Sequence, residues 1–426
     1  MTGRSFRNRK VSVRVSALVA AVWLSCGMTY AKPVSETDAR QQAWQYLDNM
    51  RLQGRQCRAK AARPAELRLA YTAEGRTGTA FYVFNTPDGE GFVLAAADDC
   101  AAPVLGYSDN GPFDYDNMPD GLKGLLSSYE RQIGNAVAGG AGKFMQSTPF
   151  DDRLDIDPLI ATRWNQGEPY NALCPLYNGR STLVGCVAVA MAQLMYYHQW
   201  PEQGRGSISY NWHGKTMTGD FSKAHFEWDK MKLSYNANTP DPNQAVATLM
   251  YYNALAATAD FGNDLTYGYF DTQKLHLYFR YKDQMGWCDM AYSSVEEFDD
   301  ILFDNLERGL PVLYRAADPA VWAHVFIVDG YRIDGYYHMN LGWGGSADGY
   351  YLLNVVNTPW ANLDSEQMMV YNIEPESAMD GVEHTVLTPV ARHKRVYNLQ
   401  GQQVGSTTDC LPRGLYVIDG KKVMIR

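Results

Sequence analysis

The chain has 426 residues, which exceeds one ordinary domain and suits two or three units of about 150 residues each. Hydrophobic residues make up 46% of it and charged residues 20%, which are globular values and argue against a disordered or collagen-like chain. The formal net charge of −9 is spread along the sequence, and no stripe rich in Lys and Arg follows the first residues. Nucleic acid is therefore a disfavoured partner.

The first residues have the pattern of a secretory signal peptide. Basic residues within positions 4–10 precede the apolar stretch Val15–Leu24, and small residues ending at Ala31 predict cleavage after that residue. The stretch is shorter than the about 20 residues that a membrane-spanning helix needs, and no later segment qualifies, so we expect no transmembrane segment. The alternative is a lipoprotein signal ending at Cys26, but Trp23 stands where such signals carry a small aliphatic residue.

A first unit of mixed helices and strands is predicted after the signal. In chain order its elements are a helix over Glu36–Met50, strands over Leu67–Thr72, Ala80–Asn85 and Phe92–Ala97, and a helix over Leu122–Ile133. The last helix runs into Asn135–Gly142, whose small residues suit an exposed, flexible linker. We expect a domain boundary there.

The second predicted unit has its helices first and its strands second. Helices are predicted over Val184–His198, Ala245–Ala259 and Val295–Glu307, and strands over Pro311–Arg315, Trp322–Val328, Tyr336–Asn340 and Tyr350–Val355. The first of these helices is nearly all apolar, so it should be buried. The strands are joined by turn signals typical of an antiparallel meander. This order of elements predicts an α+β fold.

The end of the chain reads as a separate small β-module with a basic and apolar terminus. The predicted organisation is a signal peptide over 1–31, a first domain over 32–145, a second domain over 146–375, a linker over 376–394 and a C-terminal module over 395–426.

Cys186 is the candidate nucleophile of the second unit. It stands at the predicted start of an apolar helix, where free amides and the helix dipole lower the pKa of a thiol. Gly185 before it leaves room for the backbone of a substrate. The alternative interpretation is a buried structural cysteine, because free Cys is among the most buried residue types.

The other cysteines give no sign of a disulfide scaffold or a metal site. The chain has seven, an odd number, and their spacing is irregular. No CxxC pair, HExxH motif or clustered His/Cys spacing occurs, so we expect neither a metal nor another cofactor. Whether Cys174 and Cys288 form a disulfide stays open.

A thiolate nucleophile needs a base, and His324 is the candidate because it lies within an apolar predicted strand. His338 is the competing histidine, since it also lies in a predicted strand. Acyl transfer further needs hydrogen-bond donors for the oxyanion, and Gln166 lies upstream of the cysteine as in papain-like enzymes. Trp343 could cover the imidazole or simply pack in the core.

Together these segments resemble the streptopain family of papain-like cysteine peptidases. The matching segments are Trp164–Asn171, Gly185–Pro201, Ala323–Gly330 and His338–Tyr350. The resemblance covers about residues 35–375, because the strands of the first unit look like the inhibitory prodomain of that family. It implies a papain-like fold with the cysteine on the helical part and the histidine on the antiparallel sheet.

The resemblance also implies a role for each candidate site residue. Cys186 would be the nucleophile, His324 the base, Gln166 the oxyanion donor and Trp343 the residue that shields and orients the histidine. The chain departs from the family at three places near the substrate: Leu341 replaces an aromatic residue, Ala323 replaces a glycine, and Phe261–Gly268 replaces a Ser/Gly-rich loop. The substrate-binding candidates are Gly185, Ala323 and Thr266.

The C-terminal module resembles the sorting domain of bacterial type IX secretion, in Val396–Val404, Leu411–Tyr416 and Gly420–Val423. This implies export in two steps to the cell surface or the medium, with the tail recognised by secretion machinery. We expect a monomer that acts on proteins and peptides.

The first domain is expected to inhibit the second until Cys186 cuts the chain in or near Asn135–Pro149, after which one cut lets it dissociate. Two other functions stay open. One is a Cys-His amidase or acyltransferase on the same fold, which would prefer small amides to casein. The other is a non-catalytic binding or adhesion protein, which thiol-directed inhibitors would not label.

Overall fold

A computed structural model describes residues 31–52, 63–144, 153–236, 239, 241–269, 271, 273–318, 321–356, 366–376, 396–397, 403–405, 414–418 and 421–425. The predicted signal peptide, apart from Ala31, and most of the 376–394 linker lie outside these residues. No helix among the described residues is long and apolar enough to cross a membrane.

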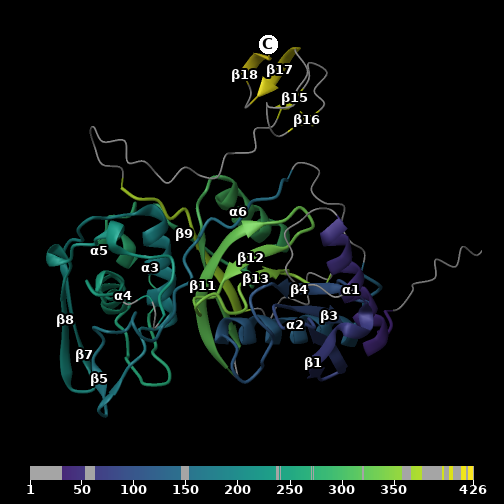
Figure 1. The fold of residues 1–426 in the computed structure, drawn as a ribbon, viewed down its shortest axis with the longest axis horizontal. Coiled ribbons are helices and arrows are strands. Elements are labelled where there is room, and N and C mark those ends of the chain that lie inside the picture. The colour runs from purple at the N-terminus through teal and green to yellow at the C-terminus, as the bar shows by residue number, and fades with distance from the viewer. Residues whose placement is uncertain are drawn as a thin grey trace, which may run out of the picture.

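The helices separate into an N-terminal pair and a later group. They are α1 (Glu36–Leu52), α2 (Asp120–Ala138), α3 (Cys186–His198), α4 (Ala245–Ala256), α5 (Gln273–Phe279) and α6 (Val295–Glu307), with 3-10 turns at Pro64–Glu66, Phe221–Lys223 and Trp228–Lys230. Figure 1 shows α1 and α3 on opposite sides of the central strands.

Ten strands form one sheet. They are β1 (Arg68–Gly75), β2 (Gly78–Asn85), β3 (Phe92–Ala96), β4 (Val104–Ser108), β9 (Gly286–Asp289), β10 (Val312–Asp318), β11 (Val321–Tyr331), β12 (Tyr337–Asn340), β13 (Gly349–Tyr351) and β14 (Glu366–Tyr371). Their order is β1-β2-β3-β4-β13-β12-β11-β10-β14-β9, with every neighbouring pair antiparallel. The first four come from the N-terminal unit (residues 31–144) and the other six from the second unit (residues 153–376). The two units therefore share a continuous sheet.

The join between the two units is the pairing of β4 with β13. Tyr107 faces Tyr350 and Ser108 faces Gly349 in this register. A side chain at Gly349 would collide with the carbonyl oxygen of Tyr107, because its Cβ would lie 2.4 Å away. Glycine is therefore required where the strands meet.

Side chains of β11 alternate between two hydrophobic cores. Phe326 and Val328 belong to the core that contains α2 and α6, whereas Val325 and Ile327 belong to the core of α3 and α4. A third core packs α1 against β3 and β4. Since α2 comes from the N-terminal unit, the first of these cores also crosses the boundary between the units.

The expected linker over Asn135–Gly142 differs from the structure in its first half, because α2 continues to Ala138. Ala136 is fully buried in the core, so the small residues here pack closely rather than flex. Beyond the helix, Phe144 donates its amide to the carbonyl of Asp99 at 2.7 Å. The chain is thus held as far as Phe144, the last described residue before Arg153.

The α+β fold class is confirmed, with the cysteine on a helix and the histidine on the antiparallel sheet. The hairpin of β7 (Ser207–Trp212) and β8 (Lys215–Asp220) was not predicted, nor were α5, β9 and β14; two short strands, β5 (Leu176–Tyr177) and β6 (Arg180–Ser181), also pair. At the C-terminus, β15 (Val396–Tyr397), β16 (Gln403–Gly405), β17 (Gly414–Ile418) and β18 (Lys421–Ile425) form a four-stranded antiparallel sheet.

Candidate active site

Cys186 is the first residue of α3, and its position follows from the residue before it. Gly185 caps the helix with φ +94°, a conformation that favours glycine, and its carbonyl accepts from the amide of Val189 at 3.2 Å. The following residues, from Val187 to Met195, are all buried. The thiol therefore sits at the amino end of a helix anchored in the core.

The surroundings of Cys186 favour its thiolate. Burial raises the pKa of the thiol, but the charge and hydrogen bonding of His324, together with the amides of Val325 and Val187, bring it below the usual range. The structure therefore brings together the predicted nucleophile and the predicted base.

His324 lies on β11 and is 3% exposed. Its Nε2 is 3.0 Å from the carbonyl oxygen of Leu341. Because a carbonyl only accepts, Nε2 must carry a proton, which leaves Nδ1 as the nitrogen that exchanges a proton with the thiol. This arrangement suits a base that takes the proton of a thiol.

The ring of His324 also packs directly against α2 of the N-terminal unit. A Cβ at Gly121 would lie 2.5 Å from Cδ2 of His324 and 3.2 Å from the ring of Phe326. Such distances leave no space for any side chain, so Gly121 lets the helix lie against the imidazole. The N-terminal unit thus touches the predicted base itself.

Gln166 lies beside the start of α3. It is 8% exposed, and its backbone carbonyl accepts from the amide of Val184, two residues before the cysteine, at 3.1 Å. This bond ties the Gln166 segment to the residues that lead into Cys186. The assignment of Gln166 as oxyanion donor stays a prediction.

Of the three substrate-binding candidates, Thr266 is buried and Ala323 is exposed. Gly185 has no side chain, so it could contact a substrate only through its backbone. The hydroxyl of Thr266 donates to the carbonyl of Leu183 at 2.8 Å and accepts from the amide of Gly262 at 3.0 Å. A Cβ at Gly185 would be 3.0 Å from the methyl group of Thr266. Thr266 thus lies against the residue that precedes Cys186, and its hydroxyl is hydrogen-bonded to backbone groups.

Trp343 is half-buried and comes two residues after Leu341, whose carbonyl His324 contacts. Its indole Nε1 is buried, with no hydrogen-bond partner among the described residues. The next residue, Gly344, donates its amide to the carbonyl of Trp164 at 2.8 Å, which ties this turn to the Gln166 segment. The shielding role of Trp343 stays a prediction.

His338, the competing histidine, is engaged elsewhere. Its Nδ1 is 2.6 Å from Oδ1 of Asp329, whose side chain is fully buried and whose other oxygen accepts from the amide of Ile160. Burial lowers the pKa of His338, but the Asp329 carboxylate outweighs this and raises it above the usual value. His338 therefore forms an ion pair within the sheet.

The family models match both units. Residues 164–351 match the peptidase C10 family, and residues 31–133 match the Spi protease inhibitor family. The chain carries a C10 peptidase domain behind an inhibitor-type prodomain. The resemblance to the streptopain family is thereby confirmed.

Two curated proteins and one solved structure are similar to this chain. The thiol protease/hemagglutinin PrtT of Porphyromonas gingivalis is 31% identical over 395 residues, which are 85% of this chain and 44% of that protein. Streptopain of Streptococcus pyogenes is 27% identical over 307 residues, covering 66% of this chain and 75% of streptopain. A prointerpain A fragment of Prevotella intermedia superposes with a TM-score of 0.63 at 29% identity, over 73% of this chain and 99% of the fragment. The chain thus spans less than half the length of PrtT.

Sequence reasoning missed a buried polar cluster behind the C10 site. Gln193, on the apolar face of α3, accepts from the hydroxyl of Thr162 at 2.9 Å and donates to Oδ1 of Asn340 at 2.9 Å. Asn340 donates in turn to the carbonyl of Thr162 at 2.8 Å. Each donor meets an acceptor, so the cluster fixes α3 against β12. A glutamine within a run of apolar residues was the signal that could have found it.

The cysteines among the described residues form no disulfide. Cys100, Cys174, Cys186 and Cys288 are free thiols, so Cys174 and Cys288 are not bonded to each other. No group of His, Cys, Asp and Glu that could hold a metal ion occurs within the part of the chain that the structure describes.

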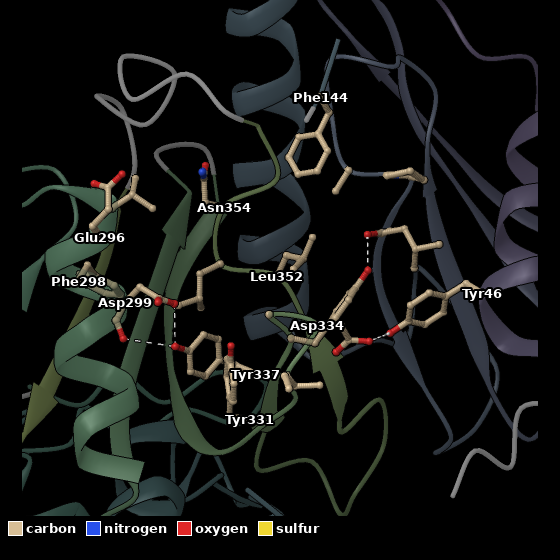
Figure 2. A pocket seen from close by; sticks show the side chains of 18 of the residues that line it. Tyr46, Phe144, Glu296, Phe298, Asp299, Tyr331, Asp334, Tyr337, Leu352 and Asn354 are labelled. Carbon is tan, nitrogen blue, oxygen red and sulfur yellow. Dashed lines mark hydrogen bonds between the residues drawn. The ribbon is translucent and has the colours of Figure 1, made fainter. Parts of the chain in front are cut away.

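A pocket of about 760 Å³ lies between the prodomain and the C10 domain, and its lining includes none of the predicted site residues. Figure 2 shows Tyr46 of α1 pointing across it to Asp334, with the hydroxyl 3.2 Å from the carboxylate, while Tyr337 bonds to Asp299 on the far wall. The walls come from both domains, so the pocket exists only while the prodomain is attached.

Proposed function

We propose that the chain is a cysteine endopeptidase made as a latent zymogen, with Cys186 as nucleophile and His324 as base. The observation that carries this is the lowered pKa of the Cys186 thiol beside His324 in a C10 peptidase domain. A thiolate at the start of a helix and an imidazolium beside it, which can give up its proton, are the two groups that acyl transfer needs.

In this mechanism the Cys186 thiolate attacks the carbonyl carbon of the peptide bond, and the oxyanion receives hydrogen bonds from the Cys186 amide and the Gln166 side chain. His324 then gives its proton to the leaving amine, and an acyl-enzyme remains. Water, deprotonated by His324, breaks the thioester and restores the thiol. No metal or cofactor takes part.

The prodomain would keep the enzyme latent through two sets of contacts. One is the packing of Gly121 in α2 against the His324 ring, and the other is the shared sheet at β4 and β13. A cut within Asn135–Ala138 would require unfolding of the end of α2, and the chain beyond it is still hydrogen-bonded at Phe144. We therefore expect the cut between Phe144 and Arg153.

Replacing Cys186 by Ala tests this function. The variant should accumulate as a proprotein, fail to hydrolyse casein, and be trimmed when active enzyme is added. The wild-type enzyme should hydrolyse casein well and small amides poorly, and a thiol-directed peptidase inhibitor should label Cys186. Casein hydrolysis by Cys186→Ala, or unaided maturation of that variant without any protease, would refute the proposal.

We further propose export by the N-terminal signal and type IX secretion through the C-terminal module. This proposal is supported by the signal-peptide pattern at the start of the sequence, the resemblance to a sorting domain at its end, and the four-stranded sheet of β15–β18. Mass spectrometry of the exported protein should find no peptide before Lys32. An intact segment 395–426 on a fully exported, unanchored product would contradict the sorting role.

Substrate preference follows from the loop that Thr266 holds beside Gly185. We propose extended peptides with an apolar side chain two residues before the cut, because this loop carries two exposed tyrosines, Tyr267 and Tyr269, near the start of α3. A peptide library dominated by acidic or basic residues at that position would rule this preference out.

A further inference from the structure

The acceptor that orients His324 is a backbone carbonyl, that of Leu341, at 3.0 Å from Nε2. Leu341 is fully buried, so water does not compete for this oxygen. A carbonyl cannot move apart from its own peptide. Whatever fixes the backbone at Leu341 therefore fixes the direction of the imidazole.

The amide of Leu341 donates to Oδ1 of Asp348 at 2.8 Å. Asp348 is 5% exposed and comes seven residues later, after a turn that doubles back on itself. Four residues in this turn have positive φ, which are Gly342, Gly344, Gly345 and Ala347. Backbone hydrogen bonds hold the middle of this turn, and the bond from the Leu341 amide to the Asp348 carboxylate ties its start to its end.

Asp348 is itself held from both sides. Its backbone carbonyl accepts from the hydroxyl of Ser108 and from the side-chain amide of Asn110, both at 2.7 Å. It also directly precedes β13, which is paired in the sheet. The carboxylate is thus a fixed acceptor, and buried fixed acceptors position their donors far better than exposed ones do.

We propose that Asp348 is a positioning residue for His324, because its carboxylate holds the Leu341 peptide whose carbonyl in turn holds Nε2–H. This inference rests on the proposed roles of Cys186 and His324. It gives the site a third side chain that acts through a backbone relay and touches neither the substrate nor the thiol.

Loss of this bond should loosen the Leu341 carbonyl and let the imidazole rotate away from the thiol. The thiolate of Cys186 would then lose the imidazolium that stabilises it, and proton transfer to the leaving amine would slow. Binding of the peptide would be unaffected. The expected signature is a lower kcat with an unchanged KM, and a higher apparent pKa of the Cys186 thiol.

The experiment compares Asp348→Ala with Asp348→Asn in the full chain, each processed by tagged wild-type enzyme that is then removed. The amide oxygen of Asn can still accept from the Leu341 amide, whereas Ala cannot. Alanine should lower kcat by about 10- to 100-fold, and asparagine by less than about 3-fold. The rate of Cys186 alkylation by iodoacetamide against pH should shift upward for Ala and stay near wild type for Asn.

Asp299→Ala is the matched control. Asp299 is a largely buried carboxylate bonded to Arg153 and Tyr337, on α6 and outside the site. Its loss should lower thermal stability without shifting the alkylation profile. If Asp348→Ala does not fold, Asp348→Asn decides alone: normal kcat and alkylation support the relay, and a folded Asn variant with low kcat overturns it.

Two results separate this inference from the proposed function. Full activity of Asp348→Ala, with Cys186→Ala inactive, would overturn the positioning role and leave the peptidase assignment intact. Activity of Cys186→Ala would overturn both.

Discussion

At the scale of single residues, the structure separates two histidines that the sequence presents as alternatives. His324 lies beside Cys186, whereas His338 is paired with the buried Asp329. The two substitutions should therefore have effects of different kinds. What distinguishes the two histidines is the neighbour of each, Cys186 for His324 and Asp329 for His338, and no local sequence pattern reveals these neighbours.

His324→Ala should lower kcat by about 10²- to 10⁴-fold, the usual contribution of a general base, with little loss of stability. His338→Ala should keep most of the kcat but lower the free energy of unfolding by about 3–5 kcal/mol, because it leaves Asp329 buried and unpaired. Turnover of a fluorogenic peptide and urea unfolding measure the two effects. A folded but inactive His338→Ala enzyme would reverse the assignment.

The stability of the proprotein should depend on pH through Asp348 and His338. Burial raises the pKa of Asp348 to about 6, and Asp329 raises that of His338, so both groups bind protons more tightly in the folded state. Their contribution is present at low pH and is lost as pH rises through their folded pKa values. For Asp348 the loss should fall between about pH 4 and pH 6 and be on the order of 2–3 kcal/mol.

Asp348→Asn removes the part of this dependence that belongs to Asp348. In the Cys186→Ala background its unfolding free energy should vary less between about pH 4 and pH 6 than that of the parent, measured by urea unfolding. Equal slopes for the two proteins would show that Asp348 keeps an ordinary pKa in the folded state.

At the scale of elements, α2 is the part of the prodomain that reaches the site. Gly121 lies against the His324 ring with no space for a Cβ, whereas a Cβ at Gly134 in the same helix would be 3.8 Å from its nearest neighbour, Thr77. The two glycines therefore offer a matched pair of substitutions within one helix.

Gly121→Ala should destabilise the Cys186→Ala proprotein by about 1–3 kcal/mol, because the ring or the helix must move. Gly134→Ala should leave it unchanged or stabilise it by up to about 1 kcal/mol, since alanine favours helix. Thermal unfolding measures both. Equal melting temperatures for the two variants would show that α2 does not press on the imidazole.

Sequence reasoning succeeded where a local pattern decides the outcome. The apolar run after Gly185 predicted α3, and the apolar run around His324 predicted β11. It failed where small residues have two interpretations: Asn135–Ala138 suits a linker by composition, yet Ala136 packs in the core. The role of Asp348 could not be predicted, because it depends on a turn that brings two distant backbone positions together.

At the scale of the whole molecule, the prodomain and the C10 domain are joined by more than the covalent linker. The sheet continues from β4 to β13, and one hydrophobic core contains residues of α2 beside residues of β10, β11 and β12. The sequence led us to expect that one cut in the linker would release the prodomain. It could not predict the shared sheet, because the pattern of a strand does not name its partner.

Cleavage of the linker alone should therefore leave the two parts associated. After a cut between Phe144 and Arg153 in the Cys186→Ala protein, both fragments should co-elute in size-exclusion chromatography under native conditions. They should separate in moderate urea or after further digestion of the prodomain. Separation directly after the first cut would mean that the shared sheet contributes little to binding.

The junction at β13 has a consequence for the enzyme once the prodomain has left. The strand then changes from an interior position to the rim of a sheet of six, and its outward backbone groups lose their partners from β4. Exposed rims of this kind recruit strands from other molecules and drive aggregation. β13 is only three residues long, from Gly349 to Tyr351, so it offers a foreign strand very few hydrogen bonds. The short length of this strand thus limits self-association of the released enzyme through strand pairing at high concentration.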